Sequence, residues 1–140
     1  MKVNAIIECT SDGLYCIFTL ESFEKFGLHG YGKTPDEAIE DFWLSYREVQ
    51  AEFGADVPPI EVTFSYDVSA FLHLCKNLLT QSGLSRLTGI NSKQISHYLT
   101  GYRNPSPKTV KKIEEAVHAF ADELQSIRLV TVKANGDVVE

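Results

Sequence analysis

The stretch GINSKQISHYLTGYRNPS, residues 89–106, carries the side chains best suited to recognise another molecule. It gathers hydroxyl, amide and imidazole groups around Ile95, includes a lysine and an arginine, and contains no acidic residue. A helix with such a surface fits the major groove of DNA, where Gln can pair with adenine, Lys with guanine, and Ser with bases or phosphates. The chemistry expected of this stretch is therefore hydrogen bonding to a nucleic acid.

Charge divides the chain into two parts, although the net charge of the 140 residues is only −6. Residues 1–66 hold twelve Asp or Glu and four Lys or Arg, whereas all seven charged residues of 68–113 are Lys or Arg. A basic stretch without carboxylates favours a polyanionic partner, because each phosphate contact releases counterions and a nearby acid would oppose it. Small basic domains without such a partner also exist, so charge alone leaves both readings open.

The other reactive side chains do not form the pattern of a catalytic or metal site. Glu8 lies on an expected strand, Asp12 in a turn, and the acids of residues 36–41 on a helix surface, so nothing brings three carboxylates to two metal ions. No nucleophile sits beside a base at a diagnostic spacing. The four histidines are scattered: His29, His73, His97 and His118. We therefore expect no enzyme, no metal and no cofactor.

Cys9, Cys16 and Cys75 are too few for a disulfide framework. In the hairpin described next, Cys9 stands opposite Cys16, so a cross-strand disulfide is possible, but two packed thiols are expected in a reducing cytosol. The polar start of the chain does not resemble a signal peptide, and no stretch is apolar enough to span a membrane. The sequence predicts a cytoplasmic protein.

Residues 1–66 carry the pattern of a small β-β-β-α-β domain. Four segments have the alternation or apolar content of strands: residues 3–9, 14–20, 26–32 and 60–66. Thr34 and Pro35 begin a helix, which Gly54 ends. Asp12-Gly13 predicts a two-residue hairpin turn that pairs Cys9 with Cys16.

This hairpin register has a consequence for assembly. It places several apolar side chains on the face opposite the core, where they are unlikely to be left in water together. The sequence thus predicts an oligomer interface formed by Ile6, Tyr15, Ile17 and the neighbouring Tyr31.

From residue 67 the pattern becomes purely helical. Four helices are expected in an all-α domain at 67–125, and the second and third are separated by TGIN, the spacing of a helix-turn-helix. Residues 126–140 form a strand or hairpin tail that either folds back on its own helices or adds to another chain. The whole chain is expected to have an α+β fold.

The segment TQSGLSRLTGINSKQISHYLTGYRNPSPKTVKKI, residues 80–113, resembles the XRE/Cro-repressor helix-turn-helix family. In that family the third helix contacts bases and the start of the second contacts phosphates. The resemblance implies base contacts from Ser92, Lys93, Gln94 and His97. It implies backbone contacts from Gln81 and Ser96, together with Arg103 and Asn104 in the following loop.

The segments DGLYCIFT, residues 12–19, and GLHGYGKTPDEAIEDFWLSYREV, residues 27–49, resemble the HicB family of antitoxins. The resemblance implies a partial RNase H-like domain whose acidic surface covers a small basic RNA-cleaving toxin of the HicA type. The central segment ESFEKF departs from that family, so the chain would be a divergent member.

Together the two resemblances imply a HicAB-type antitoxin. It would neutralise its toxin through the first domain and repress its own operon, as a homodimer or higher oligomer, through operator DNA. The alternative is a stand-alone DNA-binding transcription regulator whose α+β domain senses a ligand or only dimerises.

Overall fold

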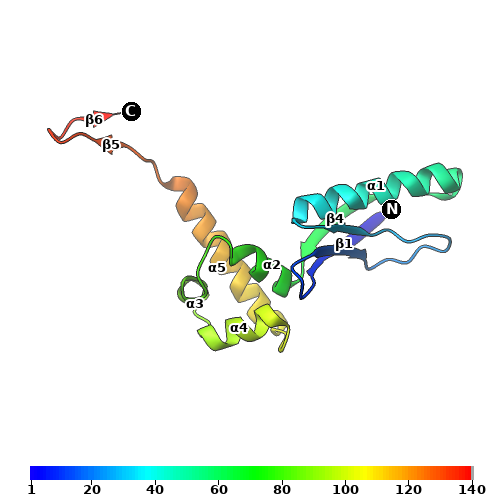
Figure 1. Cartoon of the computed structure of the whole chain (residues 1–140), viewed down its shortest axis with the longest axis horizontal. Coiled ribbons are helices and arrows are strands. Elements are labelled where there is room, and N and C mark those ends of the chain that lie inside the picture. Colours follow the sequence, from blue (N-terminus) through cyan, green and yellow to red (C-terminus); the bar gives the residue numbers. More distant parts are fainter. Residues whose placement is uncertain (140) are drawn as a thin grey trace.

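A four-stranded sheet covered on one face by a long helix forms the first half of the protein (Figure 1). The computed structural model describes residues 1–139. The elements of this half are β1 (Lys2–Cys9), β2 (Tyr15–Thr19), β3 (Gly30–Gly32), α1 (Pro35–Phe53), a short 3-10 helix (Gly54–Asp56) and β4 (Glu61–Tyr66). The strand order is β3-β2-β1-β4, with β4 parallel to β1 and the other pairs antiparallel.

Helix α1 begins where its capping residues predict. The Thr34 hydroxyl accepts a hydrogen bond from the backbone N–H of Glu37 at 3.1 Å, and Pro35 occupies the first turn. The helix lays Phe42, which is fully buried, on the sheet, where its ring meets those of Trp43 and Phe64 edge-on. The core of this half therefore lies between α1 and one sheet face.

Two glycines let β3 approach α1 closely. A Cβ on Gly30 would collide with the carbonyl oxygen of Ala38, and one on Gly32 would lie 2.5 Å from the Ala38 nitrogen. Carboxylates of α1 then cap the free edge of β3: Asp41 accepts the backbone N–H of Tyr31 at 2.8 Å. The Glu37 carboxylate likewise accepts a hydrogen bond from the backbone N–H of Lys33. Part of the acidic surface of the helix therefore stabilises the fold.

The predicted hairpin register is wrong by one residue. Cys9 pairs with Tyr15 instead of Cys16, and Ile7 pairs with Ile17. The loop contains Ser11, Asp12 and Gly13, with Gly13 in the left-handed region at φ 82°, so the turn has three residues and not two. A shift of one residue exchanges the two faces of a strand.

The corrected register overturns half of the predicted oligomer interface. Tyr15 and Ile17 point into the core and are only 6% and 2% exposed, so neither can contact another chain. Ile6 and Tyr31 do lie on the face that α1 leaves uncovered, because their pairing partners there are Phe18 and Cys16. No cross-strand disulfide forms, since the partner of Cys16 is Glu8; all three cysteines are free thiols.

The second half consists of α2 (Val68–Cys75), α3 (Gln81–Thr88), α4 (Ser92–Thr100) and α5 (Pro107–Ser126). A second hydrophobic cluster joins them, with Leu72, Ile95 and Ile113 at its centre. Helix α2 connects the two halves, because its Ala70 is buried in the sheet cluster while Leu72 belongs to the helical one. The predicted α+β fold class is confirmed.

A small hairpin ends the described chain. Strands β5 (Thr131–Val132) and β6 (Val138–Val139) pair antiparallel beyond the last turn of α5 and extend away from the other elements (Figure 1). Of the two alternatives predicted for this tail, folding back on its own helices is not observed. Glu140, the last residue of the predicted 126–140 segment, lies outside the described residues.

Candidate nucleic-acid interface

Helices α3 and α4 form the predicted helix-turn-helix, and each boundary has a visible cause. Thr80 caps α3 by accepting the Gly83 N–H at 2.9 Å, and Asn91 caps α4 by accepting the Gln94 N–H at 2.9 Å. Between them Gly89 adopts φ 73°, a left-handed conformation that ends α3 and that side-chain-bearing residues resist. Ile90 follows and is 8% exposed, which fixes the turn on the helical core.

The polar end of α4 is presented to solvent. Ser92, Lys93 and Gln94 are all exposed on its first turn, while Ile95 and Tyr98 point into the core. The structure therefore brings three of the four predicted base-reading side chains together on one accessible turn. Their contact with DNA remains a prediction.

Gln94 is held in place by its own helix. The Tyr98 hydroxyl donates a hydrogen bond to Gln94 Oε1 at 3.1 Å, and Tyr98 is only 9% exposed. The amide Nε2 of Gln94 and the second lone pair of Oε1 remain available, and these are the two groups with which glutamine pairs with adenine. The buried tyrosine thus orients a side chain suited to reading a base.

The fourth predicted base-reading residue, His97, is half-buried. Its ring lies 4.9 Å from that of Tyr102, and its Nδ1 is buried without a hydrogen-bond partner among the described residues. Ser96 beside it is also half-buried. Both residues are thus less accessible than Lys93 and Gln94.

The predicted backbone contacts form two groups. Gln81 Nε2 donates to the carbonyl oxygen of Ser92 at 2.7 Å and lies 3.0 Å from its hydroxyl, so it ties the start of α3 to the start of α4. Arg103 and Asn104 are exposed in the loop after α4. The Gln81 side chain therefore stabilises the helix-turn-helix through Ser92, in addition to its predicted contact with a phosphate.

Tyr102 is a residue of this surface that the sequence analysis missed. Its side chain is 72% exposed, stands against His97, and lies under the guanidinium of Arg103, whose Cζ is 5.9 Å from the ring centroid. An aromatic residue directly before an arginine, in the loop after a helix-ending glycine, was the available signal. Tyr102 therefore lies within cation–π distance of the arginine predicted to bind phosphate.

The charged side chains of this surface are cations without acidic partners. Lys93 and Arg103 form no salt bridge with any described residue, and the Lys112 side chain ends beside Gly89 at the turn. The ion pair described in the helical half joins Lys111 to Glu115 on α5 at 3.9 Å, and both partners are exposed. Unpaired cations with no carboxylate between residues 68 and 113 are suited to phosphate.

Neither a metal centre nor a membrane span is found in the described part of the chain. Within residues 1–139 no three His, Cys, Asp or Glu side chains are grouped to hold a metal ion. No helix there has the length and apolar character needed to cross a bilayer.

Comparison with known proteins agrees with this geometry. The helix-turn-helix family model HTH_3 matches residues 74–117, which run from the end of α2 into α5. No curated protein and no solved structure matches the chain. Residues 74–117 are therefore a helix-turn-helix domain of the XRE type, the DNA-binding module of transcription regulators.

Proposed function

We propose that this protein is a transcription regulator that inserts the first turn of α4 into the major groove of its operator. The observation that carries the proposal is the exposed group of Ser92, Lys93 and Gln94 on a helix-turn-helix surface without acids. Gln94 and Lys93 would read bases, and Arg103 and Asn104 would hold the backbone. Because its target would be genomic DNA, we also propose a cytoplasmic location.

Selection from a random double-stranded DNA pool tests this proposal. The wild-type chain should enrich a defined sequence, and a Lys93→Ala/Gln94→Ala variant should lose that enrichment while keeping its fold by circular dichroism. Ser82→Ala, an exposed change on α3 outside the proposed contact set, is a suitable control. Enrichment of the same sequence by the double variant would contradict the groove assignment.

We further propose that residues 1–66 are a partner-binding domain of the antitoxin type. Their excess of carboxylates suits a basic partner, and the β-β-β-α-β order agrees with the HicB resemblance. The face that α1 leaves open, with Ile6, Phe18 and Tyr31, offers apolar contacts beside the carboxylate of Glu8.

Co-expression separates the antitoxin from the stand-alone regulator. A small basic protein encoded beside this gene should stop growth and cleave RNA when expressed alone, and this chain should restore growth and co-purify with it. If no adjacent product arrests growth, the antitoxin role fails while the DNA-binding proposal stands.

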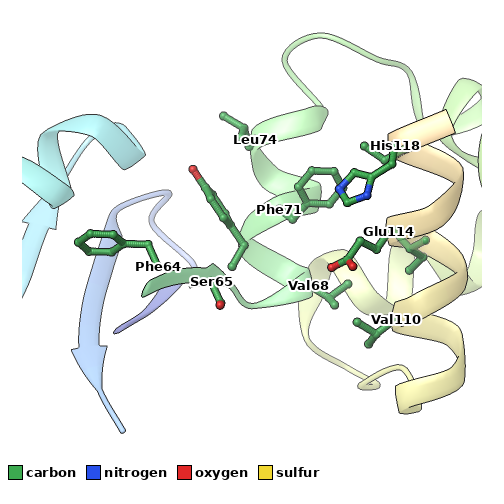
Figure 2. Close-up of a pocket in the computed structure, with 11 residues that line it drawn as sticks. Phe64, Ser65, Val68, Phe71, Leu74, Val110, Glu114 and His118 are labelled. Carbon is green, nitrogen blue, oxygen red and sulfur yellow. The ribbon is translucent and has the colours of Figure 1, made fainter. Parts of the chain in front are cut away.

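A groove between the two halves favours the alternative in which the protein senses a ligand. Its volume is about 410 Å³, and its lining includes Val68 and Phe71 of α2 and Val110 of α5 (Figure 2). Glu114 and His118, one turn apart on α5, add polar groups. A small apolar molecule bound here would couple the sheet to the helix-turn-helix, and a change in operator affinity on adding it would support the sensor role.

A further inference from the structure

The four-stranded sheet has two edges, and the structure caps only one of them. At the β3 edge, carboxylates of α1 accept hydrogen bonds from the backbone N–H groups of Tyr31 and Lys33. At the other edge β4 pairs with β1, and within residues 1–139 no strand pairs with its outer side. A row of unpaired N–H and C=O groups at a sheet edge is a template for another strand.

The hydrogen bonds to β1 identify the free backbone groups of β4. Glu61 and Asp67 donate their backbone N–H groups to carbonyl oxygens of the first strand segment, each at 2.9 Å. Because the backbone groups of successive residues in a strand point to alternate sides, Val62, Phe64 and Tyr66 direct theirs away from β1. These three residues therefore present the donors and acceptors of the open edge.

Strand β4 lacks the features that usually protect an edge from association. Its six residues include neither lysine nor proline, and its register with β1 runs from Glu61 to Tyr66 without a bulge. Lysine, proline and bulges are the common means of blocking an edge strand. Thr63 and Ser65 are exposed and carry only small hydroxyl side chains. The edge is thus accessible to an incoming strand.

The groove of about 410 Å³ between the two halves adjoins the C-terminal end of this edge. Strand β4 lines it through Phe64, Ser65 and Tyr66, while Phe71 of α2 and Val110 of α5 are among its apolar side chains (Figure 2). A segment added along β4 would extend into this groove, where its apolar side chains would be covered. Main-chain pairing and a side-chain pocket are the two components of strand recognition.

The charged groups around the open edge are acidic. Glu61 begins β4, and Glu114 supplies the carboxylate of the groove, whose described lining contains no lysine or arginine. Burial, and then the nearby charge of Asp36, raise the pKa of the Tyr66 hydroxyl, which places a third carboxylate near the end of the edge. These charges favour a basic segment and oppose pairing with a second copy of the same strand.

We propose that β4 and the groove bind an extended, basic segment of another protein as a fifth strand of the sheet. Val62, Phe64 and Tyr66 pair with its main chain, its apolar side chains enter the groove, and a lysine or arginine lies at Glu114. The inference rests on the proposed partner-binding role of residues 1–66 and specifies the form in which the partner binds. Since α2 and α5 also line the groove, the bound segment contacts the helical half as well.

Amide hydrogen exchange in the full chain, measured by NMR, tests the edge with a defined probe. The probe is a capped octapeptide of alternating valine and lysine. In the free protein the amides of Val62 and Phe64 should exchange fast, whereas that of Thr63, which points to β1, should exchange slowly. Saturation with the probe should slow Val62 and Phe64 by about tenfold or more. The same peptide methylated at every backbone nitrogen should bind at least about tenfold more weakly, because it cannot donate hydrogen bonds.

Charge reversal at Glu114 tests the groove against a matched control. Glu114→Lys should weaken binding of the valine–lysine peptide by about three- to tenfold. Glu115→Lys makes the same change at the next, exposed position of α5, outside the groove lining, and should leave the affinity unchanged. An alternating valine–glutamate peptide should bind the wild type weakly and gain affinity for Glu114→Lys. Circular dichroism should show that both variants keep their fold.

Several results would overturn the proposal. Slow exchange of Val62 and Phe64 in the free protein would mean that the edge is already occupied. Equal binding of the methylated peptide, equal effects of the two lysine substitutions, or no binding of the valine–lysine peptide at millimolar concentration would also contradict it. These measurements need neither DNA nor a natural partner. The co-expression test of the antitoxin role can therefore fail while the edge proposal stands, and the reverse.

Discussion

The Gln94 side chain is exposed, but its orientation is restrained. The hydroxyl of the buried Tyr98 donates a hydrogen bond to its Oε1, and the rest of the amide faces solvent. A side chain held in this way loses little conformational entropy on binding a base edge. Lys93, by contrast, is a flexible point charge with no described partner. The two neighbours should therefore contribute differently to sequence recognition.

Gln94→Ala should weaken binding to the selected DNA sequence by about 1–3 kcal/mol, the usual worth of a bidentate base contact. Binding to unrelated DNA should change little, because the side chain carries no charge. Fluorescence anisotropy titrations with the selected sequence and with unrelated DNA measure the two affinities. Equal losses on specific and unrelated DNA would show that Gln94 does not read a base.

Arg103→Ala should weaken binding to all sequences alike and reduce the slope of log K against log salt by about one. The reason is that a phosphate contact carries no sequence information. Titrations at several salt concentrations give the slope, and Arg86→Ala, at an exposed α3 site outside the proposed contact set, serves as the control. An unchanged slope would remove Arg103 from the backbone contacts.

Glu21 provides a pH-dependent contact at the residue scale. Its carboxylate accepts the backbone N–H of Asn4 at 2.7 Å and the Asn4 side-chain amide at 2.9 Å, and these bonds lower the pKa of Glu21 below its ordinary value of 4.5. The resulting stability is present above that ordinary value and is lost as the pH falls through the lower folded-state pKa. The free energy of unfolding of the Glu21→Gln variant should therefore differ less between neutral and acidic pH than that of the wild type. Chemical denaturation at both pH values measures this difference, and an unchanged difference would contradict the role of the contact.

At the scale of elements, the close packing of β3 on α1 depends on the absence of side chains. Gly30 faces the backbone of Ala38 and Phe42, whereas the intervening Tyr31 points to the open face and is 56% exposed. A helix backbone cannot move away from a strand without disturbing the core between them. The pair of glycines is thus a packing requirement of the sheet.

Gly30→Ala should lower the free energy of unfolding by about 1–3 kcal/mol, because the added methyl group overpacks a backbone contact. Tyr31→Ala, one position along the same strand, should cost less, since its side chain faces solvent. Urea denaturation of both variants gives the comparison. A Gly30→Ala protein as stable as the wild type would show that α1 can shift to accept the methyl group.

At the scale of the whole molecule, one helix-turn-helix contacts too few base pairs to find a unique site, so two linked copies are the usual solution. If the hairpins join the copies, Val138→Asp should weaken binding to a two-fold symmetric site by about 10²-fold or more, because the second contact loses its high effective concentration. Binding to a half-site should stay the same. Val139→Asp is the matched control, because Val139 lies on the face of the hairpin opposite to Val138. Equal affinities of the two variants for the full site would contradict the coupling.

The sequence by itself determined the helical part of this protein, because its signals are local. Thr80, Asn91 and Ser106 cap the helices that follow them, and Gly89 ends α3; residue types of this kind act on the neighbouring backbone without any tertiary contact. The exposed turn of α4 was predictable for the same reason, since helical periodicity places Ile95 inside and Lys93 outside.

Only the tertiary structure decided the sheet faces and the surroundings of the tail. In β2 both alternating sets, Tyr15 with Ile17 and Cys16 with Phe18, are apolar, so no pattern could say which faces the core. The hairpin loop has three residues instead of two, and this length sets the register in which Tyr15 and Ile17 face the core. The tail likewise carries apolar side chains on both faces of its hairpin, and whether it covers its own chain depends on the direction of α5, which is a property of packing and not of local sequence.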